Sequence, residues 1–336
     1  MIKYADIVIG LSFGDEGKGK VTNSLLKSGN YTHCIRFNGG HNAGHTIYKD
    51  GKKYVSHIIP TGLFQNVTSI IGPGCVTSAR LLEEELQPLI KAGFQTKGKL
   101  FIDKRVNLVS YEHVYEDSRD EKIGTTKKGN GPAYRDKYAR KNVRFGDLPW
   151  NDPNYDVCDI YEELHNNQDN KVLMEGAQAF GLDIDWGDYP YVTSSHCGVG
   201  SAIQNGIPFN KVRHVYGVCK AYDTYVGKKN FEGTDPVFSK IRELGQEFGA
   251  TTGRPRQIDF LDLDFLVKSA TINGVTDLIV NKMDVLEKAN VWKLKLNGKL
   301  ETCADKKQFI QTITSVMTQK TESVNRITYS ESPEDI

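Results

Sequence analysis

The sequence lacks the features of membrane, secreted and nucleic-acid-binding proteins. No apolar run approaches the roughly 20 residues that a membrane-spanning helix needs, and only a few apolar residues precede the first glycine-rich turn, so we expect no signal peptide. The six cysteines form no Cys-x-x-Cys pair, which disfavours zinc ribbons and a disulfide framework. Neither charge is in excess, with 43 Lys and Arg against 42 Asp and Glu, so we expect no nucleic-acid or membrane partner. The sequence predicts a cytoplasmic globular enzyme of small molecules.

Short apolar runs, each ending at glycine or polar residues, predict the fold. These runs cover residues 7–9, 32–37, 69–71, 172–174, 215–218 and 278–280, and stretches of helical spacing follow at 20–27 and 80–91. Alternating strands and helices predict an α/β fold with a mostly parallel central sheet flanked by helices, whose ligands bind at the carboxyl ends of the strands. We expect a single domain over residues 1–336, with a polar surface excursion at 151–170 and a polar tail at 321–336.

The segment from residue 10 to 20, GLSFGDEGKGK, has the layout of a phosphate cradle. A strand, then glycines and lysines, then a helix brings backbone N–H groups and a helix N-terminus to bound oxyanions. The Walker A pattern fails in either register, because no Ser or Thr follows the lysine. Instead the loop contains Asp15 and Glu16. A carboxylate beside phosphates is unfavourable unless it binds Mg²⁺ or exchanges a proton with the substrate.

A second glycine-rich loop, GGHNAGH at residues 39–45, is expected to act together with the first. Its interleaved glycines argue against a helix, so the two histidines are not a helical zinc pair. A loop that presents Asn42 and His45 suits backbone donors and an acid facing a transferring phosphoryl group. Further hydroxyls, glycines and cations at 124–132 and 251–256 indicate that several anions bind at once.

The sequence NKMD at residues 281–284 follows an apolar run and matches the guanine-reading signature of GTP-binding proteins. In that signature a fixed Asp, here Asp284, accepts both the N1–H and the 2-amino group of guanine. Four residues also match by chance, and a carboxylate that starts a helix is the simpler alternative. Its position after a strand in the later half of the predicted sheet favours the guanine site.

Together these segments resemble the adenylosuccinate synthetase family. The shared motifs are GDEGKGK at 14–20, GGHNAGHT at 39–46, IPTG at 59–62, GTT and GPAY within 124–134, EGAQ at 175–178, YPYVTSS at 189–195 and GATTGR at 249–254. The resemblance implies a GTP- and Mg²⁺-dependent ligase of purine biosynthesis. Such an enzyme joins L-aspartate to IMP through a 6-phosphoryl-IMP intermediate and works as a homodimer.

The resemblance also implies roles for particular residues. Asp15 would take the N1 proton of IMP and bind Mg²⁺ together with the Gly44 carbonyl, His45 would act as the acid at the moving phosphoryl group, and Lys18 would contact phosphates. The remaining implied contacts are, for IMP, Asn42, Thr126, Gln178, Thr193 and the partner subunit's Arg140; for L-aspartate, Thr252, Arg254 and Arg256; and for GTP, Gly14, Glu16, Gly17, Gly19, Lys20, Lys282 and Asp284.

Departures from the family pattern leave alternatives open. The chain is as short as archaeal and viral relatives, and Phe13 and Lys128 stand where the family usually has Trp and Arg. A sister activity of viral enzymes uses GMP or dGMP in place of IMP and makes 2-aminoadenylosuccinate. The retained Asp15 favours IMP. A catalytically inactive GTP-binding module is a further alternative, weakened because Asp15, His45 and Lys18 are all present.

Overall fold

The computed structural model describes residues 1–149, 151–249, 253–332, 334 and 336. The strands are β1 (Tyr4–Gly10), β2 (His33–Arg36), β3 (His45–Lys49), β4 (Lys52–Ser56), β5 (Thr68–Ile71), β6 (Val76–Thr77), β7 (Leu100–Asp103), β8 (Asn107–Leu108), β9 (Asp156–Cys158), β10 (Lys171–Glu175), β11 (Val212–Lys220), β12 (Tyr222–Tyr225), β13 (Gln257–Asp262), β14 (Asp277–Asn281), β15 (Lys293–Leu296), β16 (Lys299–Thr302) and β17 (Arg326–Tyr329). The helices are α1 (Lys18–Ser28), α2 (Ala79–Lys91), α3 (Tyr111–Ser118), α4 (Asn130–Tyr138), α5 (Ile160–His165), α6 (Val199–Ile203), α7 (Val237–Gly245), α8 (Leu263–Asn273), α9 (Met283–Ala289) and α10 (Lys306–Lys320), with short 3₁₀ turns at Thr61–Gln65, Phe145–Asp147, Phe180–Leu182 and Phe209–Lys211.

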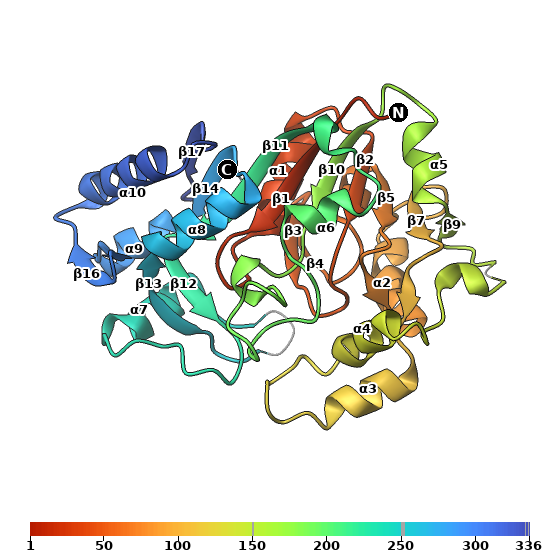
Figure 1. The fold of residues 1–336 in the computed structure, drawn as a ribbon, viewed down its shortest axis with the longest axis horizontal. Coiled ribbons are helices and arrows are strands. Elements are labelled where there is room, and N and C mark those ends of the chain that lie inside the picture. Colours follow the sequence, from red (N-terminus) through yellow and green to blue (C-terminus); the bar gives the residue numbers. More distant parts are fainter. Residues whose placement is uncertain (150, 250–252, 333, 335) are drawn as a thin grey trace.

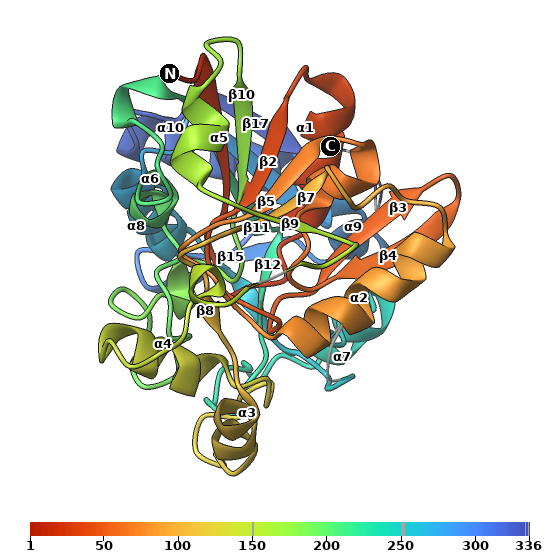
Figure 2. The ribbon, with the colours of Figure 1, turned by 90° about the vertical axis from the view of Figure 1, so that its right-hand side faces the viewer.

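A nine-stranded sheet in the order β17-β14-β11-β1-β10-β2-β5-β7-β9 runs through the molecule (Figure 1). Every neighbouring pair in it is parallel, which confirms the predicted α/β class. Helices α5, α6 and α8 lie on one side of this sheet, and α1 and α2 on the other (Figure 2). Because both faces are covered, the central strands are continuous apolar runs instead of alternating ones.

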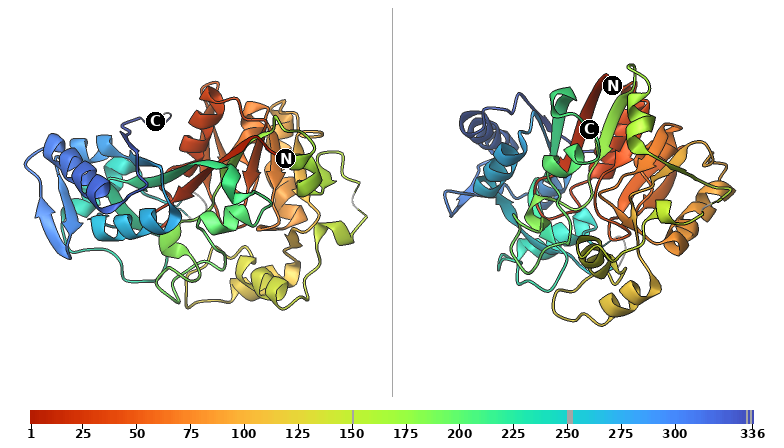
Figure 3. Two further views of the ribbon diagram at one scale, coloured as in Figure 1. Left: turned by 45° about the horizontal axis from the view of Figure 1, so that its top comes forward. Right: turned by 45° about the vertical axis from the view of Figure 1, so that its right-hand side comes forward.

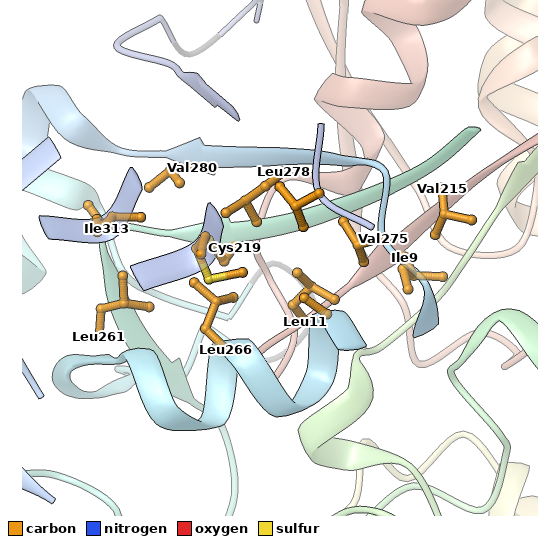
Figure 4. Close-up of a cluster of buried hydrophobic side chains, with 14 of the residues drawn as sticks. Ile9, Leu11, Val215, Cys219, Leu261, Leu266, Val275, Leu278, Val280 and Ile313 are labelled. Carbon is orange, nitrogen blue, oxygen red and sulfur yellow. The ribbon is translucent and has the colours of Figure 1, made fainter. Parts of the chain in front are cut away.

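The two sides of β1 belong to different parts of the core. Ile7 and Ile9 pack in a large cluster with residues of α8 and α10, whereas Val8 packs with Val21 and Leu26 of α1. Figure 4 shows the first cluster, in which Leu266 of α8 and Ile313 of α10 lie among side chains of β11 and β14. This packing fixes β1, β11 and β14 relative to one another, and their carboxyl ends carry the motifs described above.

The two segments expected to be a surface excursion and a polar tail contribute strands to the sheet. Residues 151–170, expected to be a surface excursion, contain β9, which pairs with β7, and α5. The polar tail at 321–336 contains β17, which pairs with β14 at the opposite edge. Both strands are short edge strands without a continuous apolar run, so their sequences gave no strand signal. A smaller sheet, β12-β13-β15-β16, was also not predicted.

Helices α3 and α4 form a hairpin at the periphery, at the bottom of both views in Figure 3. Arg140 follows α4 directly and is exposed. None of the helices described is long and apolar enough to cross a membrane.

Candidate active site

Many of the predicted site residues lie in loops at the carboxyl ends of five adjacent strands, β14, β11, β1, β10 and β2. The last residues of these strands are Asn281, Lys220, Gly10, Glu175 and Arg36. Parallel strands end at the same edge of a sheet, so the loops that follow them converge there. Four segments therefore meet there: the two glycine-rich loops, the EGAQ segment and the NKMD segment. Asn281 and Glu16, which are in contact, are 265 positions apart in the sequence.

The loop after β1 is held in shape by one of its own carboxylates. Glu16 accepts hydrogen bonds from the Gly14 amide and from Nζ of Lys18, each at 2.7 Å, and both charged side chains are buried. The backbone of Gly14, Asp15 and Gly17 is left-handed, with φ values of 93°, 60° and 93°. Asp15 is strained in this conformation, which non-glycine residues rarely adopt. The loop thus presents the Asp15 carboxylate while Glu16 and Lys18 brace it from within.

Helix α1 begins directly after this loop with an uncapped N-terminus. Its N-cap is Gly17, with no side-chain cap and no acidic residue in the first turn, so its N–H groups and dipole favour an anion. Nδ2 of Asn281 donates to the Glu16 carbonyl at 2.7 Å, which joins the NKMD segment to the phosphate loop. Lys20, assigned to GTP by the resemblance, donates here to Ser330 Oγ at 2.8 Å and Ser332 O at 2.9 Å.

His45 begins β3 and lies against the first turn of α1. A Cβ at Gly19 would lie 2.7 Å from Cβ of His45, so a glycine is needed where the two loops touch. Nδ1 of His45 is hydrogen-bonded to the Glu175 carboxylate, which also accepts from the amide and hydroxyl of Thr61 at 2.7 Å. Arg36 Nη2 lies 3.2 Å from the same carboxylate. Glu175 thereby fixes the orientation of the imidazole.

Burial and charge set the protonation of this pair. Burial, reinforced by the positive charge of Arg36, lowers the pKa of His45 to about 4, so the imidazole is neutral at pH 7. Burial works to raise the pKa of Glu175, but Arg36 and His45 outweigh it and lower that pKa to about 2. A neutral imidazole whose Nδ1–H is bound to a carboxylate directs Nε2 elsewhere, and a bound phosphate would favour the protonated ring.

Asp15 is paired with a residue of the predicted aspartate loop. Oδ2 of Asp15 lies 2.9 Å from Nε of Arg256, and the Arg256 Nη1 is hydrogen-bonded to Glu247. Arg254 is exposed, and Thr252 lies outside the described residues. The structure therefore brings Arg256 to the loop that carries Asp15, whereas Arg254, two positions earlier, is exposed.

Three of the residues assigned to the substrate nucleotide, Asn42, Thr193 and Gln178, lie in or against the loop after β2. Asn42 accepts from the Gly40 amide at 3.2 Å, and its Nδ2 lies 3.5 Å from Thr193 Oγ1. Gln178 has a left-handed backbone (φ 55°), and its buried amide makes no hydrogen bond within the described part of the chain. A Cβ at Gly39 would lie 2.7 Å from Gln178 Oε1. Asn42, Thr193 and Gln178 thus surround one glycine turn, and Gln178 has hydrogen bonds left for a ligand.

Other predicted contacts are less tightly grouped. Thr126 is half-buried, the Gly44 backbone is half-buried beside His45, and Arg140 is exposed on the α3–α4 hairpin. Nζ of Lys282 donates to the Gly245 carbonyl at 2.9 Å, and Asp284 pairs with Lys288 at 2.9 Å in the first turns of α9. Asp284 is the second residue of α9, and the residue of its motif that contacts the phosphate loop is Asn281.

Sequence reasoning gave no role to three groups that the structure places here. Glu175 supports His45, Glu247 supports Arg256, and Asn130 has both amide atoms buried without a partner among the described residues. A Cβ added at Gly40 would lie 2.6 Å from Oδ1 of Asn130, so the two residues are in close contact. The sequence did carry a signal for Glu175, because a carboxylate directly follows the apolar run 172–174. No local pattern marks the other two.

The profile of the adenylosuccinate synthetase family matches residues 7–156 and 151–329, which is nearly the whole chain. This chain belongs to the adenylosuccinate synthetase family. Among curated relatives, adenylosuccinate synthetase of Chlorobaculum parvum is 40% identical over 337 residues (84% of this chain, 77% of the relative). That of Phocaeicola vulgatus is 39% identical over 348 residues (87% and 82%).

Solved structures of the adenylosuccinate synthetase family share the fold. Adenylosuccinate synthetase of Plasmodium falciparum, in a fully ligated structure, has a TM-score of 0.78 at 32% identity and covers 90% of this chain and 84% of its own. The succinoaminodeoxyadenylate synthetase of cyanophage S-2L, bound to dGMP and dATP, has a TM-score of 0.72 at 21% identity, covering 95% and 100%. At that identity the cyanophage enzyme supports the fold alone.

Proposed function

We propose that this chain is an adenylosuccinate synthase, a C–N ligase that joins L-aspartate to IMP with hydrolysis of GTP to GDP and phosphate. Membership of the family supports the reaction. The observation that carries it is the meeting of four motifs at one sheet edge, with Asn281 of the guanine motif bonded to the phosphate loop and His45 packed on the helix that follows.

The chemistry explains why these groups are needed together. The 6-oxygen of IMP is a poor leaving group until it is phosphorylated. Asp15 removes the N1 proton, the resulting negative charge on the 6-oxygen attacks the γ-phosphorus of GTP, and GDP leaves. The negative charge of the bound phosphates favours the protonated ring of His45, which then donates an Nε2–H hydrogen bond to the phosphoryl oxygens during this step. The amine of L-aspartate then displaces phosphate from carbon 6, giving adenylosuccinate.

A Mg²⁺ ion fits the donors that the loops provide. The Asp15 side chain is 29% exposed, and Arg256 is its ion-pair partner among the described residues. With the Gly44 carbonyl it offers hard oxygen ligands, the kind that Mg²⁺ binds alongside nucleotide phosphates. When bound, Mg²⁺ supplies charge neutralisation at those phosphates. When the substrates and Mg²⁺ bind, Asp15 would give up its contact with Arg256 and contact them instead.

The substrates are assigned to the surrounding residues as follows. Asn42, Thr126, Gln178 and Thr193 bind IMP; Thr252, Arg254 and Arg256 bind L-aspartate; and Gly14, Glu16, Gly17, Lys18, Gly19, Lys20, Lys282 and Asp284 form the GTP site. The exposed position of Arg140 on a peripheral hairpin supports a homodimer in which this guanidinium reaches a neighbouring copy. All six cysteines are free, which fits the reducing cytoplasm.

Transfer of labelled nitrogen tests this proposal. The protein is incubated with GTP, Mg²⁺, IMP and ¹⁵N-L-aspartate, and the nucleotide product is identified by mass spectrometry. Adenylosuccinate carrying one ¹⁵N, formed in equal amount to released phosphate, is expected. Phosphate release without a labelled nucleotide would instead indicate a GTPase, and no release with any of the substrates would favour the inactive GTP-binding module.

A further inference from the structure

Glu247 is a buried carboxylate at the edge of this site that contacts Arg256 and has no part in the reaction proposed above. Its side chain is fully buried. It accepts hydrogen bonds from Tyr222 Oη at 2.6 Å, from Nζ of Lys220 at 3.2 Å and from Nη1 of Arg256. Lys220 and Tyr222 come from the end of β11 and the start of β12, so Glu247 joins the central sheet to Arg256.

Glu247 and Arg256 also stand at the two ends of one loop. The Arg256 amide donates to the Glu247 carbonyl at 2.9 Å, and Phe248 and Pro255 form an antiparallel bridge one step further in. The loop that carries Arg254 is therefore closed at its base twice, once by the main chain and once by the ion pair between these side chains. Beyond Glu247, the Arg256 Nε reaches Asp15 at 2.9 Å.

We propose that Glu247 is a positioning residue, which holds the Arg256 guanidinium at the base of this loop, where that guanidinium binds a carboxylate of L-aspartate. The identity of that ligand rests on the proposed function, whereas the hold on Arg256 does not. Arg256 lies between two carboxylates, Glu247 and Asp15, so the loss of one leaves the other to pull the guanidinium toward itself.

Charge supports this account. Burial works to raise the pKa of Glu247, but Lys220, Arg256 and Lys282 outweigh it and lower that pKa to about 2, so Glu247 is ionised at neutral pH. A neutral residue there would leave Arg256 with Asp15 as its remaining ion-pair partner among the described residues. Arg256 would then be held by its existing ion pair with Asp15 and no longer by Glu247.

The test uses Glu247→Gln, which keeps the shape and removes the charge. Asp6→Asn is the matched control, because Asp6 is equally buried, accepts from the Tyr31 hydroxyl and binds Arg213 (Nε at 3.0 Å) at the amino end of β1, away from the site. Both variants are treated with phenylglyoxal, which modifies accessible arginines, and the labelled arginines are identified by mass spectrometry.

In Glu247→Gln we expect Arg256 to be labelled about tenfold faster than in the wild type, since one charged hydrogen bond is lost, and Arg213 to be unchanged. In Asp6→Asn we expect Arg213 to be labelled faster and Arg256 to be unchanged. Turnover then gives the functional part: in Glu247→Gln the KM for L-aspartate should rise about tenfold while the KM values for IMP and GTP change less than about twofold. Asp6→Asn should leave all three KM values unchanged.

If Glu247→Gln does not fold, the double variant Glu247→Gln/Lys220→Met is used, because it also removes the buried Lys220 charge that Glu247 no longer pairs. The same change in Arg256 labelling and in the KM for L-aspartate is expected of it. Unchanged labelling of Arg256 in the folded variant would overturn the proposal. Faster labelling with an equal rise in all three KM values would overturn the link to L-aspartate. A wild type that does not turn over the three substrates would contradict the proposed function, and the labelling result would still decide the role of Glu247.

Discussion

The Nδ1 of His45 is bonded to the carboxylate of Glu175 where β10 ends, and Arg36 at the end of the adjacent β2 holds the same carboxylate. Two neighbouring strands thus fix the orientation of the proposed catalytic acid before any substrate arrives. Glu175→Gln should lower turnover by about a hundredfold or more, because the amide leaves the imidazole without its anionic partner.

The matched control for Glu175→Gln is Glu163→Gln. Glu163 Oε1 lies 3.5 Å from Nε2 of His33, at the other end of β2, so the variant changes a second His–Glu pair outside the site. We expect its turnover within about twofold of the wild type, as for surface substitutions. Equal losses in the two variants would show that Glu175 matters for folding alone, and thermal unfolding of both makes that comparison.

Asp15→Asn should abolish turnover while nucleotide binding persists. The amide cannot take the N1 proton, so we expect a fall in kcat of at least about a hundredfold, the usual contribution of a general base. Binding of GDP and IMP, measured by calorimetry, should change far less than kcat. Residual turnover within tenfold of the wild type would contradict the assignment of Asp15 as the base.

Asp284→Asn tests the guanine site. The variant loses two hydrogen bonds to a charged acceptor, so kcat/KM for GTP should fall about a hundredfold. Xanthosine triphosphate should gain, because its 2-oxygen accepts from the new amide. The two triphosphates are compared at saturating IMP and L-aspartate. If GTP and xanthosine triphosphate decline together, Asp284 serves only to begin α9.

Asp223 makes stability depend on pH. It is buried in β12, its Oδ1 has no partner within the described residues, and burial raises its pKa to about 7. In the unfolded chain the group ionises near pH 4, so folding loses stability as the pH rises from about 4 to 7, by up to about 4 kcal/mol. Asp223→Asn removes this loss.

The free energy of unfolding of Asp223→Asn, measured by urea denaturation, should therefore exceed that of the wild type by about 2–4 kcal/mol at pH 8 and by much less at pH 5. The difference between the two proteins is the quantity to compare, because Glu175 and Glu247 titrate in both. A difference that stays constant over this range would show that Asp223 is ionised in the folded protein.

The sequence predicted those features of the fold that depend on continuous local patterns, namely the class and the central strands. The runs at 7–9, 172–174 and 278–280 are apolar because β1, β10 and β14 are covered on both faces, so class and strand direction could be read from them. Edge strands such as β9 and β17 have no such run and were missed.

The support of the site was harder to predict for a physical reason. Glu247 meets Tyr222 and Lys220 across 25 and 27 positions, and Arg36 meets Glu175 across 139. These bonds depend on the order of strands in the sheet, which no local pattern encodes. The motifs therefore indicated the groups expected to touch substrate, whereas the residues that hold them in place required the fold.

The most direct test of the central claim is a phosphate-release assay with GTP, Mg²⁺ and L-aspartate in which IMP, GMP and dGMP are compared side by side. Because Asp15, the proposed partner of N1, is retained, we expect turnover with IMP and a kcat/KM for GMP and dGMP lower by about tenfold or more. Preference for GMP or dGMP would contradict the account and make this chain a 2-aminoadenylosuccinate synthase.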